Sequence, residues 1–161
     1  MIVVADTSVV LNLCRMQHER LLQQTFKRVL VPCEVAEEFA RLAKVQPRFA
    51  GLVLPDWIKI SSAPLPFPPE VIQADLDAGE SAAIALCLEQ HADALLIDES
   101  AGRAVANQLG LRVVGIVGIL INAKNDGLIS SVTVLLGRLE REAGFWISAE
   151  LRRHVLQLAG E

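Results

Sequence analysis

The chain has 161 residues, of which 52% are apolar and 21% are charged. This length and composition suit one globular domain with a sizeable core and exclude a disordered chain. The net charge of −4 argues against a broad basic surface for nucleic acid. A nuclease is still compatible with this charge, because a bound cation can supply positive charge at an acidic site. With no Tyr, two Trp and five Phe, the chain is poor in rings for stacking several bases.

No feature of the sequence points to a membrane or to an oxidising compartment. No apolar stretch reaches the ~18 residues that a membrane span needs. Asp6 interrupts the apolar start, and no basic region precedes it, so a secretory signal is not expected. Cys14, Cys33 and Cys87 fit neither a disulfide framework nor a CxxC metal site. We therefore expect a cytoplasmic protein with reduced, mostly buried thiols.

Short apolar runs alternate with helical patterns along the chain. Strands are predicted at residues 2–5, 27–31, 57–61, 94–97 and 112–114. Helices are predicted from residue 8 into the 20s with a break near His18, from Pro32 to about Ala43, from about Glu70, from about Ala78 to His91, between the fourth strand and Gln108, and over most of the chain after Ile116. This alternation is typical of an α/β protein whose parallel sheet is covered on both faces. No linker is visible, so we predict a single domain over residues 1–161, with C-terminal helices from about residue 130 packing on it.

Four acidic residues lie where an acid is unexpected. Asp6 ends the apolar run at residues 2–5, and Asp98 ends the run at residues 94–97. Glu38 and Glu80 fall beside or within apolar helix faces. Carboxylates are almost never buried unless they are paired or bind a metal. Ligands of open parallel sheets bind beyond the carboxyl ends of the strands, so Asp6 and Asp98 would face one crevice if their strands are neighbours.

Three of these acids also have a simple structural explanation. Asp6 and Asp98 each precede a predicted helix and could serve as its N-cap. Glu38 could be a boundary residue of an ordinary amphipathic helix. At about 100° per residue it flanks the apolar face, whereas Glu37 points nearly opposite, toward solvent.

Glu80 is the most informative of the four. It lies on the same helix face as Ile84, Cys87 and Leu88, where an apolar residue is expected. The alternative is a capping box, in which Asp77 caps the helix and Glu80 reaches back to the backbone. Both interpretations stay open from the sequence.

No other catalytic pattern competes with the acids. The histidines are isolated, and GxSxG, GxGxxG and P-loop patterns are absent. Arg41, Lys44 and Arg48 share one predicted helix face away from the core. A solvated face is the simplest interpretation of these three cations, and contact with substrate phosphates is the alternative.

Four segments carry a further signal. They are Val4-Ala-Asp-Thr-Ser8, Val31-Pro-Cys-Glu-Val-Ala-Glu-Glu-Phe39, Ala78-Gly-Glu-Ser-Ala-Ala-Ile-Ala-Leu86 and Leu95-Leu-Ile-Asp-Glu-Ser-Ala-Gly-Arg-Ala-Val-Ala-Asn-Gln-Leu-Gly110. In this order they resemble a PIN domain, of a prokaryotic PIN-like subgroup related to the toxin ribonucleases of toxin–antitoxin pairs. The resemblance implies a three-layer α/β/α domain with a central parallel five-stranded sheet in the order 3-2-1-4-5. It also implies cleavage of single-stranded RNA, a Mg²⁺ or Mn²⁺ ion, a homodimer and an antitoxin protein as partner.

The resemblance also assigns site residues by position. The catalytic acids would be Asp6, Glu38, Glu80 and Asp98. Of these, Asp6, Glu80 and Asp98 would bind the metal, while the hydroxyl of Thr7 or Ser8 would hold a ligand in place. The fourth strand lacks the Thr-x-Asp pattern of many family members, so Glu99 is the alternative to Asp98.

Together these observations predict a metal-dependent ribonuclease that hydrolyses the phosphodiester bonds of single-stranded RNA. A threonine that the subgroup often carries is absent from residues 115–117. Its absence favours the alternative, a PIN-like binding module without nuclease activity that acts through a partner protein. A phosphatase is disfavoured, because Asp6 is followed by Thr7 and Ser8 rather than by an Asp-x-Asp pattern.

Overall fold

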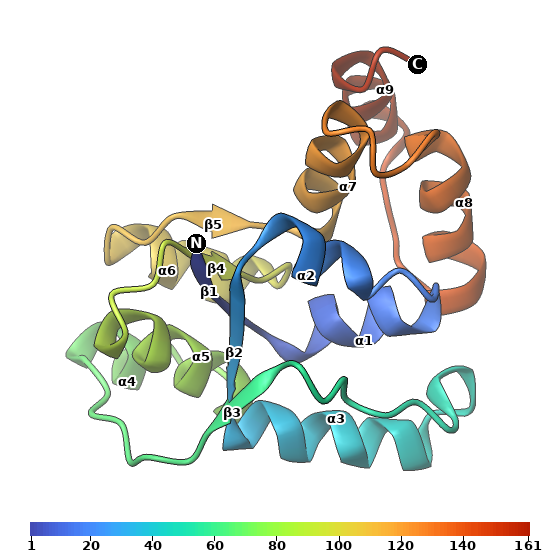
Figure 1. Cartoon of the computed structure of the whole chain (residues 1–161). Coiled ribbons are helices and arrows are strands. Elements are labelled where there is room, and N and C mark those ends of the chain that lie inside the picture. The colour runs from blue at the N-terminus through green and yellow to red at the C-terminus, as the bar shows by residue number, and fades with distance from the viewer.

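The computed structural model describes all 161 residues and is built around one parallel sheet. Its strands are β1 (Ile2–Ala5), β2 (Arg28–Pro32), β3 (Lys59–Ser61), β4 (Ala94–Leu96) and β5 (Val113–Val114). They lie in the order β3-β2-β1-β4-β5, and every neighbouring pair is parallel (Figure 1). The predicted α/β class and strand order are therefore confirmed. β1 and β4 are direct neighbours, so their carboxyl ends open at the same place.

Side chains alternate across the sheet and build two separate cores, as the period of two in a strand requires. Val3 and Ala5 of β1 belong to the larger apolar cluster, whereas Val4 between them belongs to the smaller one. Leu95 and Leu96 of β4 divide in the same way. Buried apolar residues on both faces explain why these strands read as continuous apolar runs.

Helices cover both faces of the sheet and give three layers (Figure 1). The larger cluster is covered by α1 (Thr7–Arg15), α2 (Arg20–Thr25), α3 (Cys33–Val45), α7 (Ile116–Asn125), α8 (Val132–Ala143) and α9 (Ala149–Leu158), together with the 3₁₀ turn η1 (Pro47–Phe49). The smaller cluster is covered by α4 (Pro69–Gln73), α5 (Ala78–Glu89) and α6 (Ser100–Gln108). None of these helices is both long enough and apolar enough to pass through a bilayer.

Several boundaries differ from the sequence prediction for local reasons. The first long helix is divided after Arg15, where Gln17 takes a left-handed conformation with φ of 60°, close to the predicted break at His18. The predicted strand at residues 57–61 is shorter, because the N–H of Ile58 closes a turn onto Pro55 instead of joining the sheet. The helix that begins at Ala78 ends at Glu89, two residues before the predicted end.

The cysteines are free thiols, as expected. Cys14 and Cys87 are buried, and this burial raises their pKa values to about 12 and about 11. Such thiols stay protonated at neutral pH and pack as small apolar side chains.

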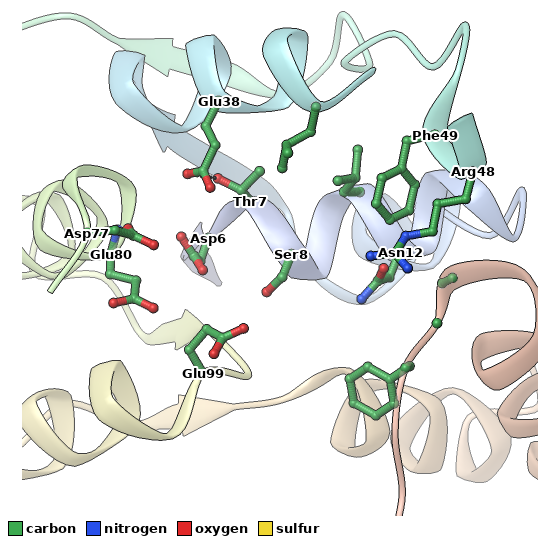
Figure 2. Close-up of a pocket in the computed structure, with 15 residues that line it drawn as sticks. Asp6, Thr7, Ser8, Asn12, Glu38, Arg48, Phe49, Asp77, Glu80 and Glu99 are labelled. Carbon is green, nitrogen blue, oxygen red and sulfur yellow. Dashed lines mark hydrogen bonds between the residues drawn. The ribbon is translucent and has the colours of Figure 1, made fainter. Parts of the chain in front are cut away.

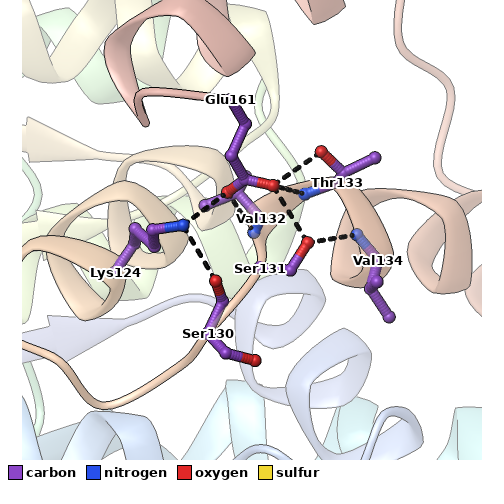
Figure 3. A network of polar contacts seen from close by, with 7 residues as sticks. All are labelled: Lys124, Ser130, Ser131, Val132, Thr133, Val134 and Glu161. Atoms are coloured by element: carbon purple, nitrogen blue, oxygen red, sulfur yellow. Dashed lines mark hydrogen bonds and ion pairs between the residues drawn. The ribbon is translucent and has the colours of Figure 1, made fainter.

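One polar cluster ties the end of the chain to the rest of the fold (Figure 3). The carboxylate of Glu161 accepts hydrogen bonds from the N–H of Val132 at 2.7 Å, from the hydroxyl of Thr133 at 2.7 Å and from the hydroxyl of Ser131 at 2.9 Å. Lys124 donates to the same carboxylate at 3.2 Å. The negative charge therefore sits at the N-terminus of α8, where free N–H groups and the helix dipole favour it.

Candidate functional site

A pocket of about 490 Å³ opens at the carboxyl ends of β1 and β4 (Figure 2). Acidic side chains crowd one end of it, and aromatic and basic side chains lie at the other. The lining residues are Asp6, Thr7, Ser8, Leu11, Asn12, Glu38, Leu42, Arg48, Phe49, Asp77, Glu80, Glu99, Ala143, Gly144 and Phe145. The pocket thus lies where ligands bind in open parallel sheets.

Asp6 stands at the centre of the acidic end. Its N–H donates to the carbonyl of Leu96 at 2.8 Å, which fixes the end of β1 against the end of β4. Asp6 is the N-cap residue of α1 by position, but its side chain makes no capping hydrogen bond. The carboxylate is only 4% exposed and turns into the pocket instead (Figure 2). The capping explanation for this acid therefore does not account for its conformation.

Glu38 reaches the pocket from α3. The hydroxyl of Thr7 donates to Glu38 Oε2 at 2.9 Å and holds the carboxylate beside Asp6 (Figure 2). A Cβ on Gly79 would stand 2.6 Å from the same Oε2 atom, so only glycine allows the carboxylate to lie against α5. Glu37 is exposed, and Glu38 is half-buried at the boundary, as the helical angle predicted.

Glu80 enters from the first turn of α5 and is 7% exposed. Asp77 is the N-cap of this helix, and its carboxylate accepts a hydrogen bond from the N–H of Glu80 at 2.8 Å. The part of the predicted capping box that Asp77 supplies is therefore present. Both side chains also line the pocket, so the cap and the acidic site coexist rather than exclude each other. Asp77 is a member of the site that the sequence identified only as a cap.

Asp98 and Glu99 point in different directions after β4. Glu99 lines the acidic end of the pocket together with Glu80 (Figure 2). Asp98 is not among the residues that line the pocket. The Oδ1 atom of Asp98 accepts a hydrogen bond from the N–H of Ile116 at 3.0 Å, and its Oδ2 atom is buried without a partner. Asp98 therefore binds the first backbone N–H of α7, and Glu99 is the acid after β4 that lies with the other acids.

The acidic end carries negative charge without a basic partner. Burial raises the pKa of Asp6 from 3.8 to about 7; the nearby N–H of Thr7 offsets part of the rise, and the charges of Asp77, Glu38 and Glu80 add to it. Burial, and then the charge of Asp77, also raises the pKa of Glu80. All ion pairs of the chain lie elsewhere, so these carboxylates repel one another at neutral pH.

Carboxylate oxygens are the ligands that Mg²⁺ and Mn²⁺ prefer, so the donor set fits a hard divalent cation. In this conformation no group of three or more acidic, His or Cys side chains is arranged to hold an ion. Ser8 adds a hydroxyl oxygen that is buried without a partner and turns toward the acids (Figure 2). The chemistry of the site fits a cation, and its side chains would have to rotate to close around one.

Of the residues at the opposite end of the pocket, the sequence singled out only Arg48, as an alternative contact for substrate phosphates. Asn12 of α1 and Arg48 and Phe49 of η1 lie there (Figure 2). Phe145, from the segment after α8, also lines the pocket. Arg48 was grouped with Arg41 on one helix face, but α3 ends at Val45 and the chain turns before Arg48. The Pro at residue 47 was the available signal, because a helix usually ends at or before the residue that precedes a proline.

Comparison with known proteins agrees with this architecture. The model of a PIN-domain family matches residues 2–161. Among solved structures, the fold is similar to a PilT N-terminus domain protein from the hyperthermophilic archaeon Sulfolobus solfataricus P2, with a TM-score of 0.50 and 18% identity. That similarity covers 76% of this chain and 93% of the archaeal chain. No curated protein matches the chain. The family match extends over almost every residue, and the chain belongs to the PIN-domain family.

Proposed function

We propose that the chain is a metal-dependent ribonuclease that hydrolyses phosphodiester bonds of single-stranded RNA. The observation that carries this proposal is the gathering of Asp6, Glu38, Glu80 and Glu99 in one pocket with no basic residue among them. Members of the PIN-domain family are commonly nucleases, which supports hydrolase chemistry at such a pocket. The preference for RNA comes from the resemblance to toxin-type members, and the antitoxin partner and homodimer stay predictions.

Some of the side chains would bind the cation, and others would orient its ligands. Asp6, Glu80 and Glu99 would hold the Mg²⁺ or Mn²⁺ ion, and the position of Glu99 on the pocket wall favours it over Asp98. The bound ion would polarise the phosphodiester and offset the charge that develops on its oxygens. Thr7 orients Glu38 toward the acids through its hydroxyl, which keeps one oxygen of Glu38 free for a water molecule or the ion.

The test compares the wild type, Asp6→Asn and Asp98→Asn on a labelled single-stranded RNA with Mn²⁺. Both variants replace a carboxylate that follows a strand, but only Asp6 lines the pocket. We expect Asp6→Asn to lose about a hundredfold or more of the cleavage rate, since a ligand of the ion is removed. Asp98→Asn should keep most of the rate. Equal cleavage by the wild type and Asp6→Asn would reject the assignment and point to a contaminating nuclease.

A second candidate is a PIN-like binding module that acts through a partner protein. The arrangement of the acids favours it, because no three of them already converge on a metal position. This candidate predicts that Mn²⁺ stabilises the wild type without any RNA being cut. Cleavage that requires both Mn²⁺ and Asp6 would exclude it.

A further inference from the structure

The pocket has a cationic end that the acidic chemistry does not use. Arg48 is the only Lys or Arg among the residues that line the pocket. Its guanidinium makes no ion pair and donates no hydrogen bond within the chain. All five of its N–H donors are therefore available to a ligand.

Arg48 is exposed to solvent, and two neighbouring residues lie against its guanidinium. Its Cζ atom lies over the ring of Phe49, 5.1 Å from the ring centroid, at a distance suited to a cation–π contact. Gly144 lies against the same guanidinium, and a Cβ there would stand 2.5 Å from Nη1 of Arg48. Gly144 also has φ of 69° as the C-cap of α8, a conformation that favours glycine. Two requirements thus keep this wall of the pocket open for the arginine.

A second polar side chain at this end of the pocket lacks a partner. Asn12 is 8% exposed and lines the pocket, yet its side-chain amide takes part in no hydrogen bond within the chain. Figure 2 shows this amide at the same end of the pocket as the guanidinium of Arg48. The polar atoms of this amide are not fully buried, so they are open to the pocket and free to form hydrogen bonds with a polar ligand.

We propose that Arg48 and Asn12 form a phosphate subsite, which binds a phosphate of the RNA strand next to the one that is cleaved. The proposal rests on the ribonuclease function proposed above and specifies its substrate. Arg48 would hold the phosphate by charge-assisted hydrogen bonds, and the amide N–H₂ of Asn12 would donate to the same group. A substrate must then carry at least one phosphate beyond the scissile one, which fits a strand and not a single nucleotide.

The ordering of charge along the pocket supports a strand rather than a free anion. A lone phosphate would be repelled by the carboxylates of Asp6, Glu80 and Glu99 at the other end. A strand with successive phosphates can place one at the cation of the acidic end and the next at Arg48. The pocket therefore has a binding element that does not depend on the metal.

The experiment measures kcat/KM for single-stranded oligoribonucleotides that grow from a dinucleotide to a pentanucleotide, with Mn²⁺ present. For the wild type we expect a rise of about tenfold at one length, where the additional phosphate reaches Arg48. For Arg48→Ala this rise should disappear, so that kcat/KM no longer increases at that length. Arg41→Ala is the matched control, because Arg41 is exposed and does not line the pocket.

Binding is measured separately with a 2′-O-methyl pentanucleotide that resists cleavage. We expect Arg48→Ala to weaken binding about tenfold and to lower the slope of log Kd against log salt by about 0.7, the value for one phosphate of a single strand. Asn12→Leu should weaken binding without changing that slope, since no charge is removed. Melting curves of the variants identify any change in folding.

The outcomes separate the two proposals. Arg48-dependent binding without cleavage of any RNA would reject the ribonuclease and leave the phosphate subsite standing. Cleavage that shows the same length dependence in the wild type and in Arg48→Ala would overturn the subsite and leave the ribonuclease standing. Equal losses in Arg48→Ala and Arg41→Ala would also overturn it, because they would reflect overall charge only.

Discussion

Asp6 and Asp98 follow two neighbouring strands, and both are carboxylates whose pKa values are raised by burial, to about 7 and about 6. Their surroundings nevertheless differ. Asp6 makes no hydrogen bond that caps α1 and turns into the pocket, whereas Asp98 accepts the N–H of Ile116 and turns toward α7. The end of a strand thus sets the position of each aspartate, and the backbone N–H groups nearby decide which way its carboxylate points.

The largest expected difference between the two carboxylates is in stability as a function of pH, in metal-free protein. The folded pKa of Asp6 is raised, so its contribution to stability is fully present below about pH 4 and is lost as the pH rises through about 7. Asp6→Asn removes this loss, which amounts to about 4 kcal/mol at most by pH 8, at about 1.4 kcal/mol for each pKa unit.

Urea unfolding in EDTA across pH 4 to 8 measures this effect. The wild type should lose stability over the whole range, and Asp6→Asn should lose less. Asp98→Asn should diverge from the wild type between about pH 4 and pH 6 and keep a constant difference in stability above that, because the raised pKa of Asp98 is about 6. Parallel curves of unfolding free energy against pH for the wild type and Asp6→Asn would contradict a raised pKa at Asp6.

The next comparison separates the two acids that follow β4. Glu99→Gln should lower RNA cleavage by about a hundredfold, or about 2.7 kcal/mol of transition-state stabilisation, because it neutralises a proposed ligand of the ion. Asp98→Asn should change cleavage by less than about threefold, because its carboxylate lies outside the pocket. Initial rates with saturating Mn²⁺ decide between them, and the reverse ranking would assign Asp98 to the metal.

Stabilisation by metal distinguishes Asp6 from Asp98 without an activity assay. Millimolar Mn²⁺ should stabilise the wild type by about 1–3 kcal/mol, which corresponds to an increase of several degrees in Tm. The increase should persist in Asp98→Asn and vanish in Asp6→Asn. Thermal melts at pH 8 measure it, with Ca²⁺ as a second hard cation. An equal increase in all three proteins would show that the ion binds outside the pocket.

The smallest effects concern two glycines, one beside each carboxylate group. A Cβ on Gly79 would meet Glu38 Oε2 at 2.6 Å, and a Cβ on Gly115 would meet Asp98 Oδ1 at 2.7 Å. Gly79→Ala should therefore displace Glu38 and reduce cleavage about tenfold. Gly115→Ala should cost about 1 kcal/mol of stability and leave cleavage nearly unchanged. Paired rate and unfolding measurements test both, and equal loss of cleavage in the two variants would contradict the division of roles.

The parallel α/β class and the position of Asp6 at the end of a strand could be predicted from apolar runs that alternate with helices, and the strand order followed from the resemblance to PIN domains. The choice between Asp98 and Glu99 could not. It depends on a hydrogen bond from Ile116, which lies 18 residues further along the chain, and no local pattern announces that bond.

The position of Glu80 was predicted correctly on an argument that proved incomplete. α5 is buried from Gly79 to Cys87 and has no single apolar face, so helical spacing could not distinguish Glu80 from its neighbours. Arg48 was placed by extending the angle of α3, although that helix ends at Val45. Both cases show that spacing is informative only while the element continues and one of its faces meets solvent.

The polar cluster around the carboxylate of Glu161 attaches the last helix by hydrogen bonds, whereas the sheet is held in place by apolar packing. Within α9 only Val155 is buried, so little apolar area holds this helix in place. The hydroxyl of Thr133 and the N–H of Val132 hold the pKa of Glu161 well below its usual range. Protonation of this carboxylate in strong acid would therefore let α9 unfold locally. Its amide hydrogens would then exchange with solvent while those of the sheet stay protected.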